Sequence, residues 1–235
     1  MLDINKHKFY MIQILKDIYS DSTLNSILGF KGGTALMFFY NLPRFSVDLN
    51  FNLLDREKQD ICFEKLRKIV LKYGKIEDEA VKFYGILLVL DYGIGERKLK
   101  IEVSNRADDN RYEIKNLLGI SVLTMVEEDM FANKLCALLD RNSITNRDIF
   151  DCWFFMNNGT DVNEDIIKKR MGKPVPDYLG DCIKAMEPLK DKSLLDGLGE
   201  LIDFEQKKFV RNKLYSEFMT SLAIFQAFPL IAKTN

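Results

Sequence analysis

The sequence predicts a mixed α/β (α+β) protein, in which a sheet with flanking helices forms the first half and helices alone form the second. Helical and strand periodicities alternate up to about residue 122, and the pattern after Thr124 is almost wholly helical. A chain of 235 residues with 47% hydrophobic and 29% charged residues can also bury a substantial core. We therefore expect one domain at 1–121 and a helical domain at 122–235, with no flexible linker between them.

In the first domain, helices are expected where apolar residues recur every three or four positions, and strands where apolar and polar residues alternate. Asn5 can cap the first helix, Pro43 lies in a turn, and Gly74 closes the last helix. In order, the expected elements are a helix at 5–19, a strand at 27–31, a helix at 34–40, a strand at 47–53 and a helix at 56–72.

In the rest of the chain, the sequence pattern changes from strands to helices near residue 124. Before it, strands are expected at 80–90, at 98–103 and within 112–122, with a glycine-bearing hairpin turn at 92–96. Beyond it, amphipathic patterns predict helices at 124–140, 146–157, 162–171, 178–187 and 204–226. We expect the helical domain to close a cleft over the sheet domain.

Charge and histidine content exclude several functions. The chain has 34 Lys and Arg residues against 35 Asp and Glu residues, which excludes wholesale coating of nucleic acid but permits a local basic patch. Basic stretches at 168–170 and 207–208 either guide an RNA or form solvated helix faces. His7 is the only histidine, so a histidine-rich zinc site is excluded, and we expect an exposed or half-buried helix residue there.

Cysteine spacing and hydropathy indicate a cytoplasmic protein. None of the four cysteines forms a C-x-x-C pair, so buried, reduced thiols are expected. The N-terminal segment mixes charges with apolar residues and lacks a secretory hydrophobic region. No run approaches the roughly 18–20 apolar residues that span a membrane, so no membrane partner is expected.

Two features near the N-terminus are candidates for chemistry. Gly32 and Gly33 lie between a predicted strand and a predicted helix, where they form either a tight turn or a phosphate cradle at the helix N-terminus. Ser46, Asp48 and Asn50 are then expected to project from one face of the next strand. That face is either solvated or a site for Mg²⁺, which prefers oxygen ligands.

A third candidate lies on the predicted strand at 98–103 and just beyond it. Lys100, Glu102 and Ser104 share one face there. If this strand is a neighbour of the one that carries Asp48, Glu102 adds a second carboxylate to the site. The alternative is the ordinary polar alternation of a solvated sheet.

A fourth candidate lies in the helical half. Lys134 and Arg141 lie along one helical stripe, and Asp148 and Asp151 share a face of the next helix. These residues form either a helix hairpin with surface ion pairs or a functional cluster, since the other residues of the segment are apolar.

Taken in order, these motifs resemble those of the AbiEii/AbiGii-type nucleotidyltransferase toxins, which belong to the DNA polymerase beta nucleotidyltransferase superfamily. The matching motifs are Gly32-Gly33-Thr34-Ala35-Leu36, Arg44-x-Ser46-x-Asp48-x-Asn50, Lys100-x-Glu102, and Lys134 with Arg141 and Arg147-Asp148-x-x-Asp151. The resemblance covers roughly residues 29–153. It implies a polymerase-beta-like nucleotidyltransferase sheet with flanking helices, an α-helical C-terminal domain, and an active site between the two.

The resemblance also implies roles for individual residues. The nucleotide-binding residues would be Gly32, Gly33, Thr34, Ser46, Lys134 and Arg141; the metal ligands Asp48, Asn50 and Glu102; and the catalytic residues Ser46, Asp48, Lys134 and Asp148. The cofactor would be Mg²⁺ and the substrate an NTP. RNA such as tRNA would be the acceptor, and the protein partner would be a DNA-binding antitoxin.

Asn50 departs from the family pattern, which usually has Asp at this position. A neutral amide is a poorer ligand for a hard cation, so either one metal suffices, Glu102 compensates, or the protein binds NTP and turns over slowly. The expected function is Mg²⁺-dependent nucleotide transfer to RNA by the toxin of a toxin–antitoxin or phage abortive-infection system. The alternatives are NTP-dependent phosphoryl transfer on the same scaffold, and a degenerate nucleotide-binding module that acts through a protein partner.

Overall fold

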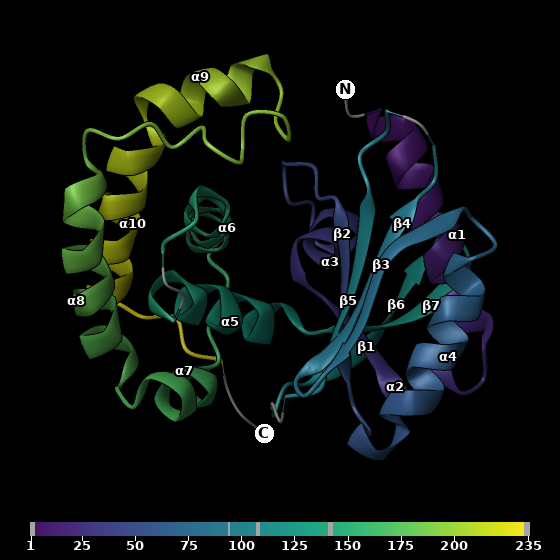
Figure 1. The fold of residues 1–235 in the computed structure, drawn as a ribbon. Helices are drawn as coiled ribbons and strands as arrows, with labels where there is room; N and C mark the ends of the chain where they lie inside the picture. The colour runs from purple at the N-terminus through teal and green to yellow at the C-terminus, as the bar shows by residue number, and fades with distance from the viewer. Residues whose placement is uncertain (1–2, 94, 107–108, 141–142, 233–235) are drawn as a thin grey trace. The chain divides into compact units, whose positions relative to one another are not determined.

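The structure, a computed structural model, describes residues 3–93, 95–106, 109–140 and 143–232 (Figure 1). The chain forms two compact units. The first contains Met1–Asn41 and Phe45–Met125, and the second contains Leu42–Arg44 and Val126–Asn235. The division after Met125 lies at the end of a strand, four residues beyond the boundary expected from the sequence. The assignment of Leu42–Arg44 to the second unit was not predicted.

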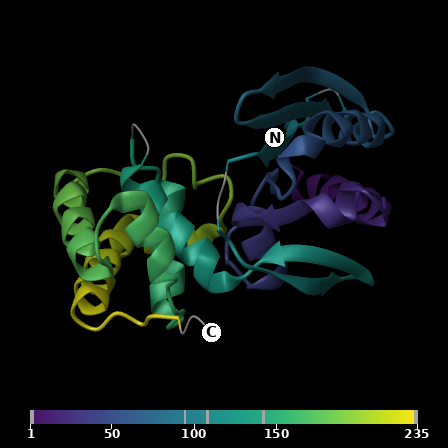
Figure 2. The same cartoon turned by 90° about the horizontal axis from the view of Figure 1, so that it is seen from below.

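Within the described residues, the first unit is built on a seven-stranded sheet with the order β3-β4-β5-β2-β1-β7-β6. β2 runs parallel to β5 and β1 parallel to β7, whereas the other described pairs are antiparallel. The β3–β4 and β6–β7 hairpins form opposite edges of the sheet (Figure 2). The strands are β1 (Leu28–Lys31), β2 (Asp48–Leu53), β3 (Lys75–Lys82), β4 (Gly85–Asp91), β5 (Leu99–Ser104), β6 (Tyr112–Leu117) and β7 (Ile120–Met125).

The two faces of this sheet differ in character. Along β2, Leu49 and Phe51 are fully buried, while Asp48 and Asn50 on the opposite face are only half-buried. Figure 1 shows α1 and α4 on one side of the sheet and α3 on the other. The helices of this unit are α1 (Ile4–Ser20), α2 (Leu24–Ile27), α3 (Gly32–Phe39), the 3₁₀ turn η1 (Arg56–Lys58) and α4 (Gln59–Val70).

Helices make up the second unit. Its core includes Phe131, whose ring centroid lies 4.9 Å from that of Phe155 and 5.5 Å from that of Phe225. Among the described residues, no helix of the chain is long and apolar enough to cross a membrane. The elements are α5 (Glu127–Leu139), α6 (Asn146–Asn157), α7 (Glu164–Met171), α8 (Val175–Met186), the 3₁₀ turn η2 (Glu187–Leu189), α9 (Phe204–Asn212) and α10 (Leu214–Ala227).

The mixed α/β class is confirmed, and the predicted helix at 146–157 has the bounds of α6. The single strand predicted at 80–90 is wrong, because that region contains the turn of the β3–β4 hairpin. The short strand predicted within 112–122 is confirmed by β6, but the start of β7 in the same region was not predicted. The predicted helix at 204–226 is also wrong as one element, since Lys213 interrupts it. The first helix is capped by Asp3 rather than Asn5, through a bond from the Lys6 backbone N–H to the Asp3 carboxylate.

The four cysteines are buried and free, as predicted. His7, in contrast, is fully buried rather than exposed or half-buried. Its Nε2 lies 2.9 Å from the Val47 carbonyl oxygen, which can only accept, so Nε2 carries the proton. Nδ1 then accepts from the Tyr92 hydroxyl at 2.5 Å. Burial lowers the pKa of His7 below its ordinary value of 6.5, so the ring is neutral at neutral pH.

This buried histidine is expected to make the first unit less stable as the pH falls from about 7.5 to 5.5. The unfolded chain then binds a proton that the folded chain resists, so acid favours unfolding by roughly 1.4 kcal/mol per unit of difference between the two pKa values. Urea unfolding at both pH values, with His7→Gln beside the wild type, measures this effect. The variant, whose side chain does not titrate, should show the smaller loss; an equal loss in both proteins would contradict the prediction.

Candidate functional site

The glycine motif forms the first turn of α3 and not a loop before it. Gly32 has φ +81°, a conformation that favours glycine, and it follows the extended residue Lys31. Among the residues that the structure describes, no side chain caps this helix start, and its first N–H groups are of the kind that bind a phosphate. The Thr34 hydroxyl donates to the Asp48 main-chain carbonyl at 2.5 Å. This bond ties the glycine turn to the start of β2.

The start of β2 brings the second motif against the first. A Cβ on Gly32 would lie 3.4 Å from the Asn50 Cβ, so the Asn50 side chain is the immediate neighbour of the turn. Asp48 and Asn50 share one face of β2, as predicted. Ser46 does not belong to this strand, because β2 begins at Asp48; it is buried in the loop that precedes β2.

The third motif lies directly beside the second. β5 is the parallel neighbour of β2, and the register pairs Asn50 with Glu102 and Asp48 with Lys100. Because paired residues share a face, Glu102 is on the same side of the sheet as Asp48 and Asn50. Glu102 is exposed, and its Oε1 lies 3.5 Å from the Lys100 Nζ. The condition set by the sequence, that the strand with Glu102 is the neighbour of the strand with Asp48, is therefore fulfilled, and the Glu102 carboxylate lies on this face.

The donor set on this face suits a hard cation with few protein ligands. Asp48 and Glu102 provide carboxylate oxygens and Asn50 an amide oxygen, which is the chemistry that Mg²⁺ accepts while keeping waters and substrate phosphates. Among the described residues, no group of three or more His, Cys, Asp or Glu side chains is placed to hold a metal ion. The residues therefore fit an ion whose coordination shell is completed by substrate phosphates and water rather than by protein ligands alone.

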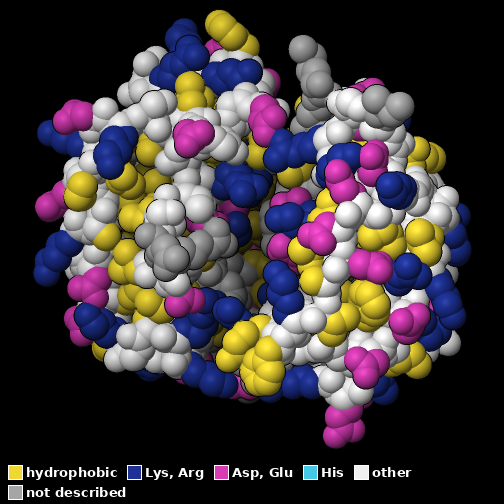
Figure 3. Space-filling view, viewed as in Figure 1, with side chains coloured by type: hydrophobic (Ala, Val, Ile, Leu, Met, Phe, Trp, Pro, Cys, Tyr) yellow, Lys and Arg dark blue, Asp and Glu magenta, His cyan; other side chains and the backbone are white. Residues whose placement is uncertain are grey.

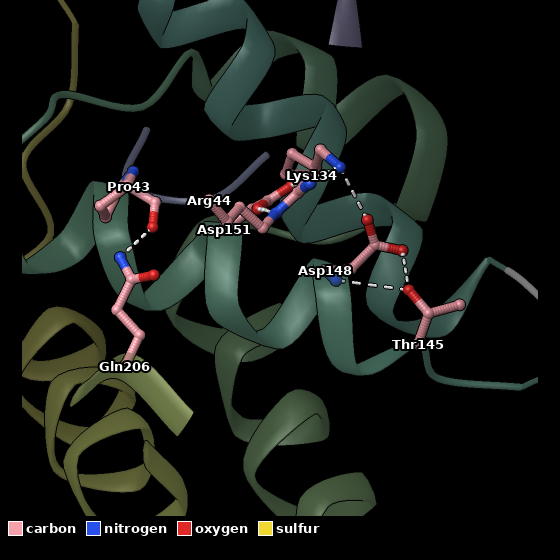
Figure 4. A network of polar contacts seen from close by, with 7 residues as sticks. All are labelled: Pro43, Arg44, Lys134, Thr145, Asp148, Asp151 and Gln206. Atoms are coloured by element: carbon pink, nitrogen blue, oxygen red, sulfur yellow. Dashed lines mark hydrogen bonds and ion pairs between the residues drawn. The ribbon is translucent and has the colours of Figure 1, made fainter. Parts of the chain in front are cut away.

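The fourth motif forms a buried charge network in the second unit (Figure 4). Arg44 donates to both carboxylate oxygens of Asp151, from Nε at 2.6 Å and from Nη2 at 2.7 Å. The Lys134 Nζ lies 2.7 Å from Asp151 and 2.9 Å from Asp148. The Thr145 hydroxyl donates to the second oxygen of Asp148 at 2.7 Å. Two cations and two carboxylates thus neutralise each other within one cluster.

Because these ion pairs are buried, they strongly affect the pKa values of the groups that form them. The side chains of Arg44, Asp151 and Asp148 are 3%, 0% and 2% exposed, and that of Lys134 is 17% exposed. Burial alone would raise the pKa of Asp151, but Arg44 and Lys134 outweigh burial and lower it. Burial likewise opposes the charge of Lys134, but Asp151 and Asp148 raise its pKa. Of the two alternatives left open for this segment, the structure contradicts surface ion pairs for this cluster.

The segment that supplies Arg44 is held at a second point. Gln206, near the start of α9, donates its side-chain amide to the carbonyl of the neighbouring Pro43 (Figure 4). Gln206 also forms the capping box of α9 with Asp203. The sequence motifs contain Arg44 and its partner Asp151, but they predict no role for either residue. The signal that points to them is a pair of acidic residues within the otherwise apolar run of α6.

Arg141, predicted to bind nucleotide, lies outside the described residues. The structure places the other predicted residues in two groups. The first unit holds Gly32, Gly33, Thr34, Ser46, Asp48, Asn50 and Glu102, and the second holds Lys134 and Asp148.

Comparison with solved structures defines the class of fold. The chain resembles the crystal structure of JHP933 from Helicobacter pylori, with a TM-score of 0.57 and 21% identity over 97% of both chains. It also resembles a candidate nucleotidyltransferase from H. pylori, with a TM-score of 0.57 and 22% identity over 94% of this chain and 97% of that one. The fold is therefore nucleotidyltransferase-like.

A family model then specifies the class further. The model for the nucleotidyl transferase AbiEii toxin of type IV toxin–antitoxin systems matches residues 13–220, and the chain belongs to this family. The resemblance inferred from the motifs is confirmed. A search of curated proteins gave no match.

Proposed function

We propose that the protein is a Mg²⁺-dependent nucleotidyltransferase that transfers a nucleotide from an NTP to RNA and acts as the toxin of a toxin–antitoxin pair. The observation that carries this proposal is the convergence of three motifs on one face of the first unit. Asp48 and Asn50 on β2 and Glu102 on β5 lie on adjacent strands, and the start of α3, which follows β1, lies beside Asn50.

The proposed division of labour follows from these positions. The backbone N–H groups of Gly32, Gly33 and Thr34 bind the triphosphate. Thr34 uses its backbone N–H and not its hydroxyl, because the hydroxyl already donates to the Asp48 main-chain carbonyl. Ser46 lies near the phosphates. Asp48, Asn50 and Glu102 hold Mg²⁺, which neutralises charge on the phosphates when bound. Asp48 also orients the acceptor hydroxyl for in-line attack on the α-phosphorus, with pyrophosphate as the leaving group.

The register also supports activity despite the neutral residue in the second metal position. Asn50 and Glu102 are direct neighbours across the parallel pair of strands, so a carboxylate lies beside the amide that replaces Asp. From the second unit, we propose that Lys134, Arg141 and Asp148 contribute to nucleotide binding and catalysis. Lys134 retains its charge because its pKa is raised by Asp151 and Asp148. A separate DNA-binding antitoxin is the proposed protein partner.

Label transfer tests this function directly. The purified protein is incubated with each α-labelled NTP, Mg²⁺ and total tRNA, beside Asp48→Ala. We expect labelled RNA from the wild type alone and no labelling in the presence of a chelator. Equal labelling by both proteins would remove Asp48 from the reaction. Transfer of label from γ-labelled but not α-labelled NTP would instead establish phosphoryl transfer.

Asn50 favours the second candidate function, a nucleotide-binding module that acts through its partner. Replacing Asn50 with aspartate is expected to lower the Mg²⁺ concentration needed for half-maximal transfer about tenfold, because a carboxylate is the stronger ligand for a hard cation. Mg²⁺ titration of label transfer and of nucleotide binding measures both effects. One outcome would support the binding module. In that outcome the wild type transfers no nucleotide, and Asn50→Asp binds Mg²⁺ and NTP more tightly but also transfers none.

A further inference from the structure

We propose that the tip of the β3–β4 hairpin, which consists of Lys82–Gly85 with Arg106 beside it, binds the single-stranded end of the acceptor RNA by base stacking. The inference rests on the proposed function, because it takes from it that the acceptor is RNA. The hairpin tip lies wholly in the first unit. It was not among the features predicted to carry chemistry.

Two neighbouring aromatic side chains at the hairpin tip lie open to solvent. Phe83 is 82% and Tyr84 is 59% exposed, and their ring centroids are 4.7 Å apart at near right angles. Figure 3 shows hydrophobic side chains gathered at this end of the hairpin. Neither ring is buried in the core, so this adjacent pair is open to a ligand.

The hairpin tip is held in one conformation by the adjacent chain. The Asn105 side-chain amide donates to the Phe83 carbonyl at 3.0 Å, and its backbone N–H donates to the Tyr84 carbonyl at 3.1 Å. Gly85 has φ +150°, and a Cβ there would collide with the Val103 carbonyl oxygen. The two rings are therefore presented by a fixed backbone, which reduces the entropy lost on binding.

Cations accompany these rings. The Arg106 guanidinium lies 5.2 Å from the centroid of the Tyr84 ring, and Lys82 begins the turn. Exposed aromatic faces combined with Arg or Lys form the platforms on which single-stranded nucleic acid stacks. The basic stretch of α7 differs, because Lys168 pairs with Glu164 at 3.1 Å and Arg170 with Asp140 at 2.5 Å. Those pairs favour a solvated helix face for α7.

The hairpin tip lies close to the proposed metal site along the sheet. Gly85 pairs with Ser104, and Leu87 pairs with Glu102. At a rise of about 3.3 Å per residue, the first pair lies about 7 Å beyond the second. The β5 partner of Asp48 lies four residues before Ser104, so an RNA strand stacked on the tip runs past Glu102 and about 13 Å along the sheet to bring its end to Asp48. Protein docking is less well supported, since a stable interface needs roughly 800 Å² per partner and two rings offer far less.

Binding to RNA without nucleotide tests the proposal independently of transfer. Fluorescence anisotropy of a labelled, single-stranded oligoribonucleotide of about ten nucleotides is compared for the wild type and a Phe83→Ala, Tyr84→Ala double variant. We expect at least about tenfold weaker binding by the double variant, from the loss of two stacking surfaces. Phe204→Ala is the matched control, because Phe204 is 75% exposed in the second unit, and it should bind like the wild type.

Two further probes separate stacking from charge. Tyr84→Trp should keep the affinity, and its fluorescence should be quenched by the oligoribonucleotide but not by an abasic strand with the same phosphates. Unchanged binding by the double variant, or equal binding of the abasic strand, would overturn the proposal. Loss of antitoxin binding by the double variant with RNA binding intact would assign the tip to the protein partner. Label transfer to RNA that survives removal of both rings would leave the proposed function standing and reject this inference alone.

Discussion

Replacing Asp151 with alanine is expected to lower the free energy of unfolding of the second unit by about 3–5 kcal/mol. Asp151 is fully buried and satisfies Arg44 with two hydrogen bonds and Lys134 with an ion pair. Its removal takes from Arg44, whose side chain is only 3% exposed, the carboxylate that accepts two of its hydrogen bonds, and the loss of this counter-charge in a buried position is costly. Urea unfolding followed by the fluorescence of Trp153, the single tryptophan and a residue of α6, measures the effect.

Matched variants separate the stranded charge from other effects of substitution. Glu164→Ala breaks an exposed ion pair of α7 and is expected to cost less than about 1 kcal/mol. The double change Arg44→Met with Asp151→Leu removes both charges and should destabilise less than Asp151→Ala. The difference between wild type and Asp151→Ala should also narrow at acid pH, because Asp151 loses its charge as the pH falls through its lowered pKa. Coincident unfolding curves at neutral pH would refute the role of the network.

Periodicity in the sequence was sufficient for the class of fold and for regular buried elements. The helix of α6 has strong apolar repeats and the Thr145 cap, and its predicted bounds agree with the structure. β3 was missed because its segment, KIEDEAVK, lies at the sheet edge and has mostly exposed side chains, so hydrophobic alternation is weak. The turn after β6 was missed because Leu118 adopts φ +50°, a conformation that its residue type does not signal.

The candidate site was predictable where its parts lie on adjacent strands. Alternation predicted that Asp48 and Asn50 share one face of their strand, and that Glu102 joins them if its strand is the neighbour. The register shows that the two strands are side by side. The charge network was not predictable, because Arg44 reaches Asp151 from a segment 107 residues earlier in the chain. Local spacing reveals which residues share a helix face, but it cannot reveal the distant residue that makes their burial favourable.

Replacing Asp48 with asparagine is expected to reduce nucleotide transfer about a hundredfold or more, because the amide no longer offers a charged ligand to Mg²⁺. The fold should survive, since the side chain is isosteric and the Asp48 main-chain carbonyl still accepts from the Thr34 hydroxyl at 2.5 Å. Single-turnover label transfer across a range of Mg²⁺ concentrations measures the loss, and thermal unfolding confirms that the variant is intact.

Asp78→Asn is the matched control for this change. Asp78 is exposed on the edge strand β3 of the same unit, so the same charge is removed from the same sheet without touching the site. We expect wild-type transfer from this variant at every Mg²⁺ concentration. A comparable loss in both variants would attribute the effect to net charge rather than to the Asp48 carboxylate. Full transfer by Asp48→Asn would show that Glu102 and the substrate phosphates hold the ion without Asp48, and the metal site would have to be centred on β5.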